Sequence, residues 1–247
     1  MEIELLNKRI NYEYKGDGNA MLFVHGWGGN IESLDGLYQY FSKNFKCFKL
    51  DLPGFGKSQN PDSNWGIIEY SNLIELFIKK VIKSKVTYLG HSFGGSIGLY
   101  LAANSDVIDE MVLFAPPLKR KGEKKTSFSK KIPFYNILKP ALYPFRKLVY
   151  RLIYPDSQAL TYPHLEENFK KLVTQSLVSE LPKIKNRTLI IWGDKDSFVS
   201  VEEGYMLDKG LKNSQLKVYN DVEHNLPIVK IDEVVNDINY FLNKSYD

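Results

Sequence analysis

Residues 90–94 read Gly-His-Ser-Phe-Gly and place Ser92 at a sharp turn between two different elements. The β-branched and aromatic run 86–89 predicts a strand before the turn, and the small residues of 94–104 predict a helix after it. Glycine two positions either side of the serine is needed because the backbone there is strained and the strand and helix pass closely. The pattern is typical of a nucleophile elbow, which presents a serine hydroxyl for attack on a carbonyl carbon.

A serine hydroxyl needs a base within hydrogen-bond reach, and the chain offers four histidines. His25 ends an early predicted strand, His91 belongs to the serine turn, and His164 falls in a proline-rich segment. Only His224 follows the last predicted strand, in the loop that leads into the final helix. We therefore predict His224 as the general base.

Two aspartates follow the seventh predicted strand and are candidates for the acid that orients this base. We predict Asp196 in that role. Asp194 comes directly after Gly193, and we expect it to stabilise its own turn by an Asx-type hydrogen bond. The order serine, aspartate, histidine is the one expected when these groups follow strands five, seven and eight of one sheet.

Attack on a carbonyl creates an oxyanion, which backbone amides can stabilise. The glycine-rich segment 25–29, after the third predicted strand, leaves the Trp27 amide open. The Phe93 amide lies at the start of a helix, where free amides and the helix dipole favour negative charge. We predict these two amides as the oxyanion hole, and we expect His25 and Gly26 to border the substrate.

The predicted elements place these residues on one scaffold. From residue 21 onward, mostly continuous apolar runs are separated by helical patterns such as 67–83 and 234–243, which indicates a parallel sheet covered on both faces. The first two runs are predicted to form an antiparallel hairpin at one edge, joined by residues 7–9. The eight predicted strands are 3–6, 10–14, 21–25, 47–51, 86–90, 110–115, 188–192 and 215–219.

The alternation of strands and helices stops between about residues 116 and 181, a stretch that contains seven prolines. We interpret it as a lid inserted into one α/β core made of residues 1–115 and 182–247. Its apolar side chains, among them Phe134, Leu138 and Leu142, are expected to line a cleft beneath it. A membrane-surface helix has a similar composition, but the prolines argue against a helix of sufficient length.

Charge is distributed unevenly along the chain. The overall net charge is +4, whereas residues 119–151 hold eleven basic residues and one acid, which leaves −6 for the rest. Such a segment can attract an anionic partner, or it can be a solvated loop. We expect a small-molecule substrate, with an acidic acyl-carrier protein as a further candidate partner and no nucleic acid.

Other sequence features argue against several functional classes. The single cysteine, Cys47, lies in an apolar run and is expected to be a buried structural thiol. The Gly-Lys-Ser at 56–58 lacks the earlier glycine of a phosphate loop, because Asp51 occupies that position. No zinc or dinucleotide pattern is present, so we expect no metal and no cofactor. Acidic residues near the start and the lack of a long apolar run predict a cytoplasmic protein without stable membrane insertion.

Taken together, four segments resemble the successive signatures of the α/β-hydrolase superfamily, and the resemblance spans nearly the whole chain. They are His-Gly-Trp-Gly at 25–28, Asp-Leu-Pro-Gly-Phe-Gly at 51–56, the serine turn at 90–95, and Trp-Gly-Asp-Lys-Asp at 192–196. The first two, with Ser58, look particularly like the pimeloyl-ACP methyl ester carboxylesterases. That resemblance implies an acidic carrier protein met through basic lid residues.

These features predict a serine carboxylic-ester hydrolase that forms an acyl-enzyme with a small or medium hydrophobic acyl ester. A C–C bond hydrolase or a thioesterase of the same fold would use the same three residues and remains an alternative, as does a pimeloyl-ACP methyl ester esterase. A ligand-binding homologue with little turnover is the alternative from another class, because fold does not fix function.

Overall fold

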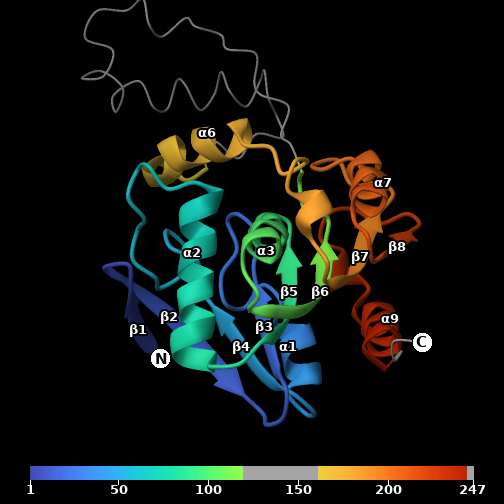
Figure 1. The fold of residues 1–247 in the computed structure, drawn as a ribbon, viewed down its shortest axis with the longest axis horizontal. Helices are drawn as coiled ribbons and strands as arrows, with labels where there is room; N and C mark the ends of the chain where they lie inside the picture. Colours follow the sequence, from blue (N-terminus) through green and yellow to red (C-terminus); the bar gives the residue numbers. More distant parts are fainter. Residues whose placement is uncertain (119–160, 244–247) are drawn as a thin grey trace, which may run out of the picture.

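The computed structural model describes residues 1–118 and 161–243, and within them a single eight-stranded sheet forms the centre of the molecule (Figure 1). The strands are β1 (Glu2–Leu5), β2 (Lys8–Lys15), β3 (Ala20–Val24), β4 (Lys46–Leu50), β5 (Val86–His91), β6 (Ile108–Phe114), β7 (Arg187–Gly193) and β8 (Ser214–Tyr219). The α-helices are α1 (Asp35–Phe41), α2 (Ile67–Phe77), α3 (Phe93–Asn104), α6 (Glu166–Thr174), α7 (Val201–Gly210), α8 (Leu226–Val229) and α9 (Ile231–Asn243).

The strand order is β1-β2-β4-β3-β5-β6-β7-β8, with parallel pairing from β4 to β8 and antiparallel pairing of β2 with β1 and β4. This confirms the predicted α/β-hydrolase architecture, an eight-stranded, mostly parallel sheet with an edge hairpin. The hairpin turn is tighter than expected. Leu5 pairs with Lys8, and Leu6 and Asn7 between them both have positive φ, as in the two-residue turns that match strand twist.

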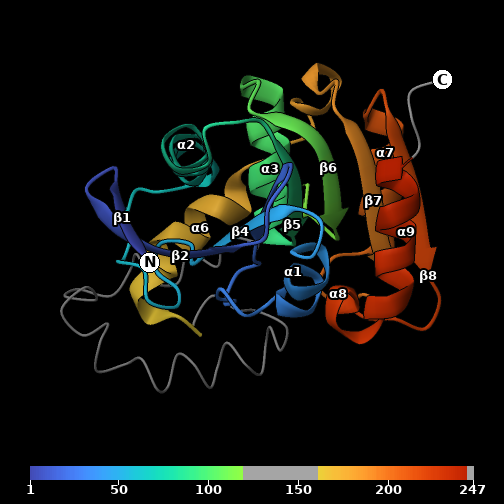
Figure 2. The ribbon, with the colours of Figure 1, turned by 90° about the horizontal axis from the view of Figure 1, so that it is seen from below.

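Helices cover both faces of the sheet, which explains why the central strands are continuously apolar (Figure 2). On one face, the side chains of α2, α3 and α7 pack with Tyr88 and Trp192 in a large core cluster. On the other face, α1 and α9 pack against Phe23 and Ile191 in a second cluster. Cys47 of β4 is fully buried, as expected, and burial raises the pKa of its thiol to about 12.

Two predicted helices differ in detail from the structure. The helix expected over 67–83 is α2 followed by one π-helical turn, η1 (Ile78–Ile82), and it ends where Lys83 adopts a left-handed φ of 63°. The last helix, α9, begins at Ile231, three residues earlier than expected. Neither difference moves a candidate site residue.

Residues 119–160 of the expected lid lie outside the described residues, and with them Phe134, Leu138, Leu142 and the basic cluster. The described part of the lid contains α6 and one short 3₁₀ helix, η3 (Pro163–Leu165), and a second 3₁₀ helix, η4 (Leu181–Lys183), spans the boundary between lid and core. Figure 1 shows α6 beyond the upper end of α2, on the side toward which β5 and β6 point. Within the described ranges, no helix is both long enough and apolar enough to cross a membrane.

Candidate active site

Ser92 lies in the predicted turn between β5 and α3, with a left-handed φ of 50° and ψ of −113°. Its backbone amide donates a 2.7 Å hydrogen bond to the carbonyl of Phe114 at the end of β6. A Cβ on Gly90 would lie 2.8 Å from the backbone of Gly94, and one on Gly94 would lie 2.2 Å from the Val24 carbonyl oxygen. Only glycine fits at these two positions, because the backbones of the neighbouring elements approach so closely. The surrounding structure thereby holds Ser92 in its strained conformation.

His224 and Asp196 meet directly, although their loops follow different strands. Nδ1 of His224 lies 2.6 Å from Oδ2 of Asp196, and the Asp196 side chain is fully buried. The other carboxylate oxygen, Oδ1, accepts hydrogen bonds from the amides of Phe198 and Val199. Because a carboxylate only accepts, Nδ1 of His224 carries a proton, and Nε2 of a neutral ring has the free lone pair that a base needs.

The Asx-type hydrogen bonds of this turn belong to Asp196, whereas the sequence led us to expect them from Asp194. The Asp194 side chain is exposed, and its backbone amide instead donates to the carbonyl of Tyr219 in β8. The expectation was wrong because the turn needs its acceptor two residues further on, where the amides of Phe198 and Val199 converge. One aspartate therefore both builds the turn and holds His224.

His91, which directly precedes Ser92 in the chain, is in contact with His224. Nε2 of His91 lies 3.1 Å from the His224 carbonyl oxygen, and the two imidazole centroids are 4.9 Å apart. Within the described residues, the Ser92 hydroxyl makes no hydrogen bond, so the contact between nucleophile and base is open in this structure. Catalytic hydrogen bonds are often long without substrate and tighten in the Michaelis complex.

The two amides predicted for an oxyanion hole flank the same turn. Phe93 is the first residue of α3, and Trp27 follows Gly26, whose Cβ would lie 3.2 Å from Cβ of Ser92. Neither the Trp27 nor the Phe93 amide donates a hydrogen bond to another described residue. The loop that carries Trp27 is closed by a hydrogen bond from the Gly29 amide to the Gly26 carbonyl.

A tyrosine from the described part of the lid also contacts this loop, which we did not predict. The Tyr162 hydroxyl donates a 2.9 Å hydrogen bond to the carbonyl of Gly28. Gly28 has a left-handed φ of 79°, and a Cβ there would lie 2.8 Å from the same hydroxyl. The only sequence signal was an aromatic residue next to Pro163, which does not specify a contact 134 residues away.

The His25 side chain forms hydrogen bonds with two loops, the one that carries Trp27 and the one after β4, whereas we expected it to border the substrate. Its Nε2 accepts a hydrogen bond from the Leu52 amide, so Nδ1 carries the proton and donates to the Gly26 carbonyl at 2.7 Å. Burial lowers the pKa of this imidazole to about 4, so the ring is neutral. With both nitrogens occupied, His25 has no hydrogen-bonding group left for a substrate, although its neighbour Gly26 lies against Ser92.

The Gly-Lys-Ser segment at 56–58, which resembles part of a phosphate loop, lies against the buried carboxylate of Asp51. Oδ1 of buried Asp51 accepts from the Ile31 amide, and Oδ2 accepts from the Lys57 amide and the Asn11 side chain. A Cβ on Gly56 would lie 2.2 Å from the Asp51 carboxyl carbon. Asp51 therefore ties the loop after β4 to the loop that carries Trp27, a role that the motif alone did not reveal.

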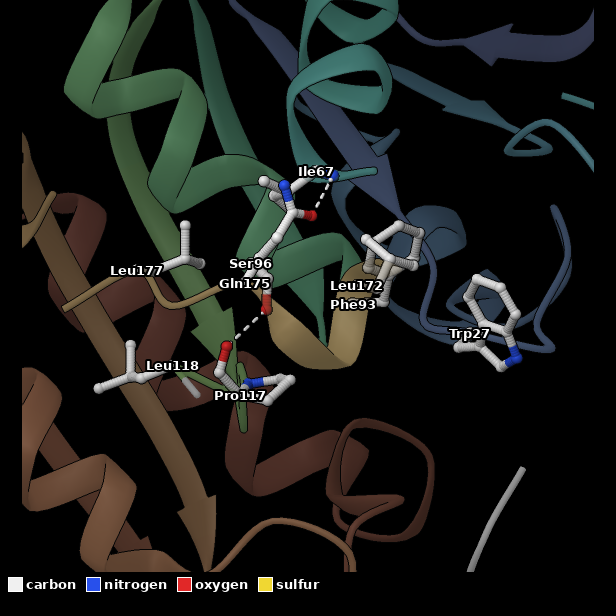
Figure 3. A pocket seen from close by; sticks show the side chains of 9 residues that line it. All are labelled: Trp27, Ile67, Phe93, Ser96, Pro117, Leu118, Leu172, Gln175 and Leu177. Atoms are coloured by element: carbon white, nitrogen blue, oxygen red, sulfur yellow. Dashed lines mark hydrogen bonds between the residues drawn. The ribbon is translucent and has the colours of Figure 1, made fainter. Parts of the chain in front are cut away.

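An apolar pocket opens beside the two candidate oxyanion residues (Figure 3). The volume of the pocket that the centre of a water molecule can occupy is about 30 Å³. Its polar atoms are largely occupied, since Ser96 donates to the Pro117 carbonyl and Oε1 of Gln175 accepts from the Ile67 amide. The lining residues are Trp27, Ile67, Phe93, Ser96, Pro117, Leu118, Leu172, Gln175 and Leu177.

Sequence reasoning missed most of this pocket because its residues come from separate elements and share no motif. Only Trp27 and Phe93 were singled out, and for their amides.

His164, set aside as a base, lies exposed with its Nε2 against the Gly54 carbonyl. In the part of the chain that the structure describes, no three His, Cys, Asp or Glu side chains are grouped as metal ligands would be.

Comparison with known proteins extends these observations. Residues 19–143 match a family model described as the alpha/beta hydrolase fold. An uncharacterized protein of Mycobacterium tuberculosis is 27% identical over 106 residues, which make up 42% of this chain and 31% of that protein. The match thus spans about a third of the length of the first curated relatives.

Other relatives match over nearly the full chain. A pimeloyl-[acyl-carrier protein] methyl ester esterase of Aliivibrio fischeri is 21% identical over 95% of this chain and 98% of its own length. A 2-hydroxy-6-oxo-6-phenylhexa-2,4-dienoate hydrolase of Comamonas testosteroni is 24% identical, covering 94% and 90% of the two chains. The crystal structure of the enol-lactonase from Burkholderia xenovorans superimposes with a TM-score of 0.78 at 17% identity, over 99% of this chain and 100% of that one, a likeness of fold.

Proposed function

Because this chain belongs to the alpha/beta hydrolase fold family, we propose that it is a serine carboxylic-ester hydrolase that acts through Ser92, His224 and Asp196. The observation that carries the proposal is the 2.6 Å contact between His224 and Asp196, beside a serine in a strained turn. A base oriented by a buried carboxylate and a serine held at the apex of a strained turn are the two parts that acyl transfer needs.

In the proposed reaction, Nε2 of His224 takes the Ser92 proton as Oγ attacks the acyl carbonyl carbon. The carbonyl π electrons move to oxygen, and the amides of Trp27 and Phe93 stabilise this oxyanion. The intermediate collapses to an acyl-serine, and the alcohol leaves with the proton from His224. Water then repeats the sequence and releases the acid, while Asp196 stays ionised and stabilises the imidazolium.

The apolar pocket supports a small or medium hydrophobic acyl group. It begins at Trp27 and Phe93, where the carbonyl oxygen would bind, and Leu172 and Leu177 form part of its wall. Leu118, the last residue described before the gap at 119–160, also lines the pocket, and Phe134, Leu138 and Leu142 follow it in the sequence. Burial of an acyl chain would contribute about 0.8 kcal/mol per methylene.

A C–C bond hydrolase of the same fold is a second candidate, favoured by the Comamonas relative. Thioester hydrolysis and ligand binding with little turnover are further alternatives, since the same three residues serve several reactions. Substrate competition separates them. A C–C hydrolase would cleave a vinylogous diketone faster than esters, and a thioesterase would favour the acyl-thioester over the matched oxygen ester.

An acidic acyl-carrier protein is the proposed macromolecular partner. The support is the charge of +10 in residues 119–151 and the Aliivibrio relative, whose name includes such a carrier. Reversing the charges of Lys124, Lys125, Lys130 and Lys131 should lower kcat/KM for an acyl-carrier substrate and spare a small neutral ester. Equal losses on both substrates would count against this partner.

The test of the main proposal is turnover of p-nitrophenyl esters of graded acyl length. Ser92→Ala should lower kcat by about 10⁶-fold. The matched control is Ser105→Ala at the other end of α3, whose hydroxyl donates to Glu75. It should stay within about twofold of wild type, because this partly buried hydrogen bond lies outside the proposed site and its loss costs only about 1 kcal/mol of stability. A Ser92→Ala variant with near wild-type turnover would remove Ser92 from the reaction.

A further inference from the structure

His91 lies between the two loops on which the proposed chemistry depends. It is the last residue of β5 and directly precedes Ser92. Its Nε2 lies 3.1 Å from the backbone carbonyl oxygen of His224, and its ring faces the His224 ring at 4.9 Å with an interplanar angle of 43°. The proposed reaction uses neither nitrogen of His91.

The contacts of His91 determine which nitrogen carries its proton. A carbonyl oxygen only accepts, so Nε2 must be the donor and Nδ1 has the lone pair. Burial and the adjacent His224 lower the pKa of the His91 imidazole to about 3, against the opposing charge of Asp196, with His25 as a further titratable neighbour. The ring is therefore neutral, and no positive charge competes with a His224 imidazolium.

The opposite side of the ring lies against the loop that carries Trp27. A Cβ built on Gly26 would lie 3.2 Å from Nδ1 of His91 and 3.2 Å from Cβ of Ser92. The imidazole thus fills the space between the loop of the base and the loop of the oxyanion amides. Asp196 orients the His224 ring, but it does not set the distance from the His224 backbone to the serine turn.

We propose that His91 is a positioning residue, whose Nε2–H holds the His224 carbonyl and so sets the distance from the base to Ser92. This inference rests on the proposed function of Ser92 and His224. His91 transfers no proton. It acts by removing a motion of the 220–225 loop that would carry the base away from the nucleophile, and small misplacements of reacting groups cost large factors in rate.

The experiment compares His91→Leu, which removes the donor, with His91→Gln, which keeps an N–H at similar reach. The control is His164→Leu, because His164 also places Nε2 3.1 Å from a backbone carbonyl, that of Gly54, outside the proposed machinery. His91→Leu should lose about 10- to 100-fold in kcat with KM changed less than about threefold. His91→Gln should recover to within about fivefold of wild type, and His164→Leu should stay within about twofold.

Two NMR measurements extend the test, and the first needs only the wild-type enzyme, so it does not depend on whether the leucine variant folds. Nitrogen NMR of the wild-type enzyme should show His91 neutral and protonated at Nε2 between pH 5 and pH 9, with the His224 Nδ1 proton in its hydrogen bond to Asp196. The downfield signal of that Nδ1 proton should weaken in the leucine variant and return in the glutamine variant. A His91 proton on Nδ1, or a leucine variant with wild-type kcat, would overturn the inference.

The outcomes also separate this inference from the proposed function. If the wild-type enzyme cleaves no ester and Ser92 does not react with a phosphonate, the proposed function fails. If wild type is active, Ser92→Ala is inactive and both His91 variants match wild type, only the positioning role fails. If the leucine and glutamine variants lose activity equally with unchanged Tm, steric fit and not the N–H is responsible, which also contradicts the proposal.

Discussion

Oδ2 of Asp196 lies 2.6 Å from Nδ1 of His224, and this contact joins the loops that follow two adjacent strands, β7 and β8. The loops are held together by backbone contacts as well. The Lys195 amide donates to the carbonyl of Val222, and Gly193 lies so close to Val222 that a Cβ would meet its carbonyl oxygen at 2.1 Å. The backbone contacts between these two loops therefore fix the geometry of the pair, which does not depend on side-chain packing alone.

Replacing the carboxylate by an amide should place the proton on the wrong nitrogen. In Asp196→Asn, the remaining side-chain oxygen is expected to keep accepting the hydrogen bonds from the amides of Phe198 and Val199. The new NH₂ group then faces Nδ1 of His224. The imidazole would then be protonated at Nε2 and could not accept the Ser92 proton, and kcat should fall by about 10⁴-fold.

The matched control for this change is Asp194→Asn, in the same turn but exposed. It should retain kcat within about threefold, since the charge there is screened by solvent. Both variants are compared on one p-nitrophenyl ester at several pH values. Similar losses in the two would argue that the turn, and not the contact with His224, determines activity.

Gly193→Ala should destabilise the protein, because its methyl group would meet backbone that cannot move away. We expect the free energy of unfolding to fall by about 1–3 kcal/mol. Gly36→Ala is the contrast, since its methyl group would meet the movable end of Ile231 and α1 would gain helix propensity of about 1 kcal/mol. Urea denaturation of both variants tests this, and equal stabilities would show that the loops can part freely.

Acid should destabilise the fold through His25. Its pKa is about 4 in the folded protein, against 6.5 for an unperturbed histidine, so the unfolded chain binds more protons between these values. Stability from His25 is complete above pH 6.5 and is lost as pH falls toward 4, by up to about 1.4 kcal/mol per pH unit. Urea denaturation at pH 7, 6, 5 and 4 should show a shallower slope for His25→Gln than for wild type. Parallel curves would exclude this residue as a source of acid sensitivity.

Tyr162→Phe removes one hydrogen bond to the loop that carries Trp27. Because the hydroxyl donates to the Gly28 carbonyl, its loss should cost about 0.5–1.5 kcal/mol of stability. A comparable loss in the transition state would lower kcat by about three- to tenfold with little change in KM. Tyr205→Phe on the exposed face of α7 is the control and should match wild type. A selective rise in KM would instead place Tyr162 in substrate binding.

The sequence alone determined the sheet, the serine turn and the identity of the candidate base and acid. Sequence runs marked each strand to within two residues. The runs of β3, β5, β6 and β7 are mostly apolar because these parallel strands are buried on both faces. The glycines at 90 and 94 indicated the turn, since a Cβ at either position would lie within 3 Å of neighbouring backbone atoms. The chain order of Ser92, Asp196 and His224 followed from the sheet that those strands imply.

Tertiary structure decided what local patterns leave open. It assigned the Asx-type hydrogen bonds to Asp196 instead of Asp194, turned His25 toward Leu52, and brought Tyr162 to Gly28 and His91 to the His224 carbonyl. It also built the pocket from residues with no common motif. The physical reason is that side-chain hydrogen bonds depend on the relative placement of loops to within a few tenths of an ångström. That placement results from packing of the whole core, which periodicity and motif spacing do not encode.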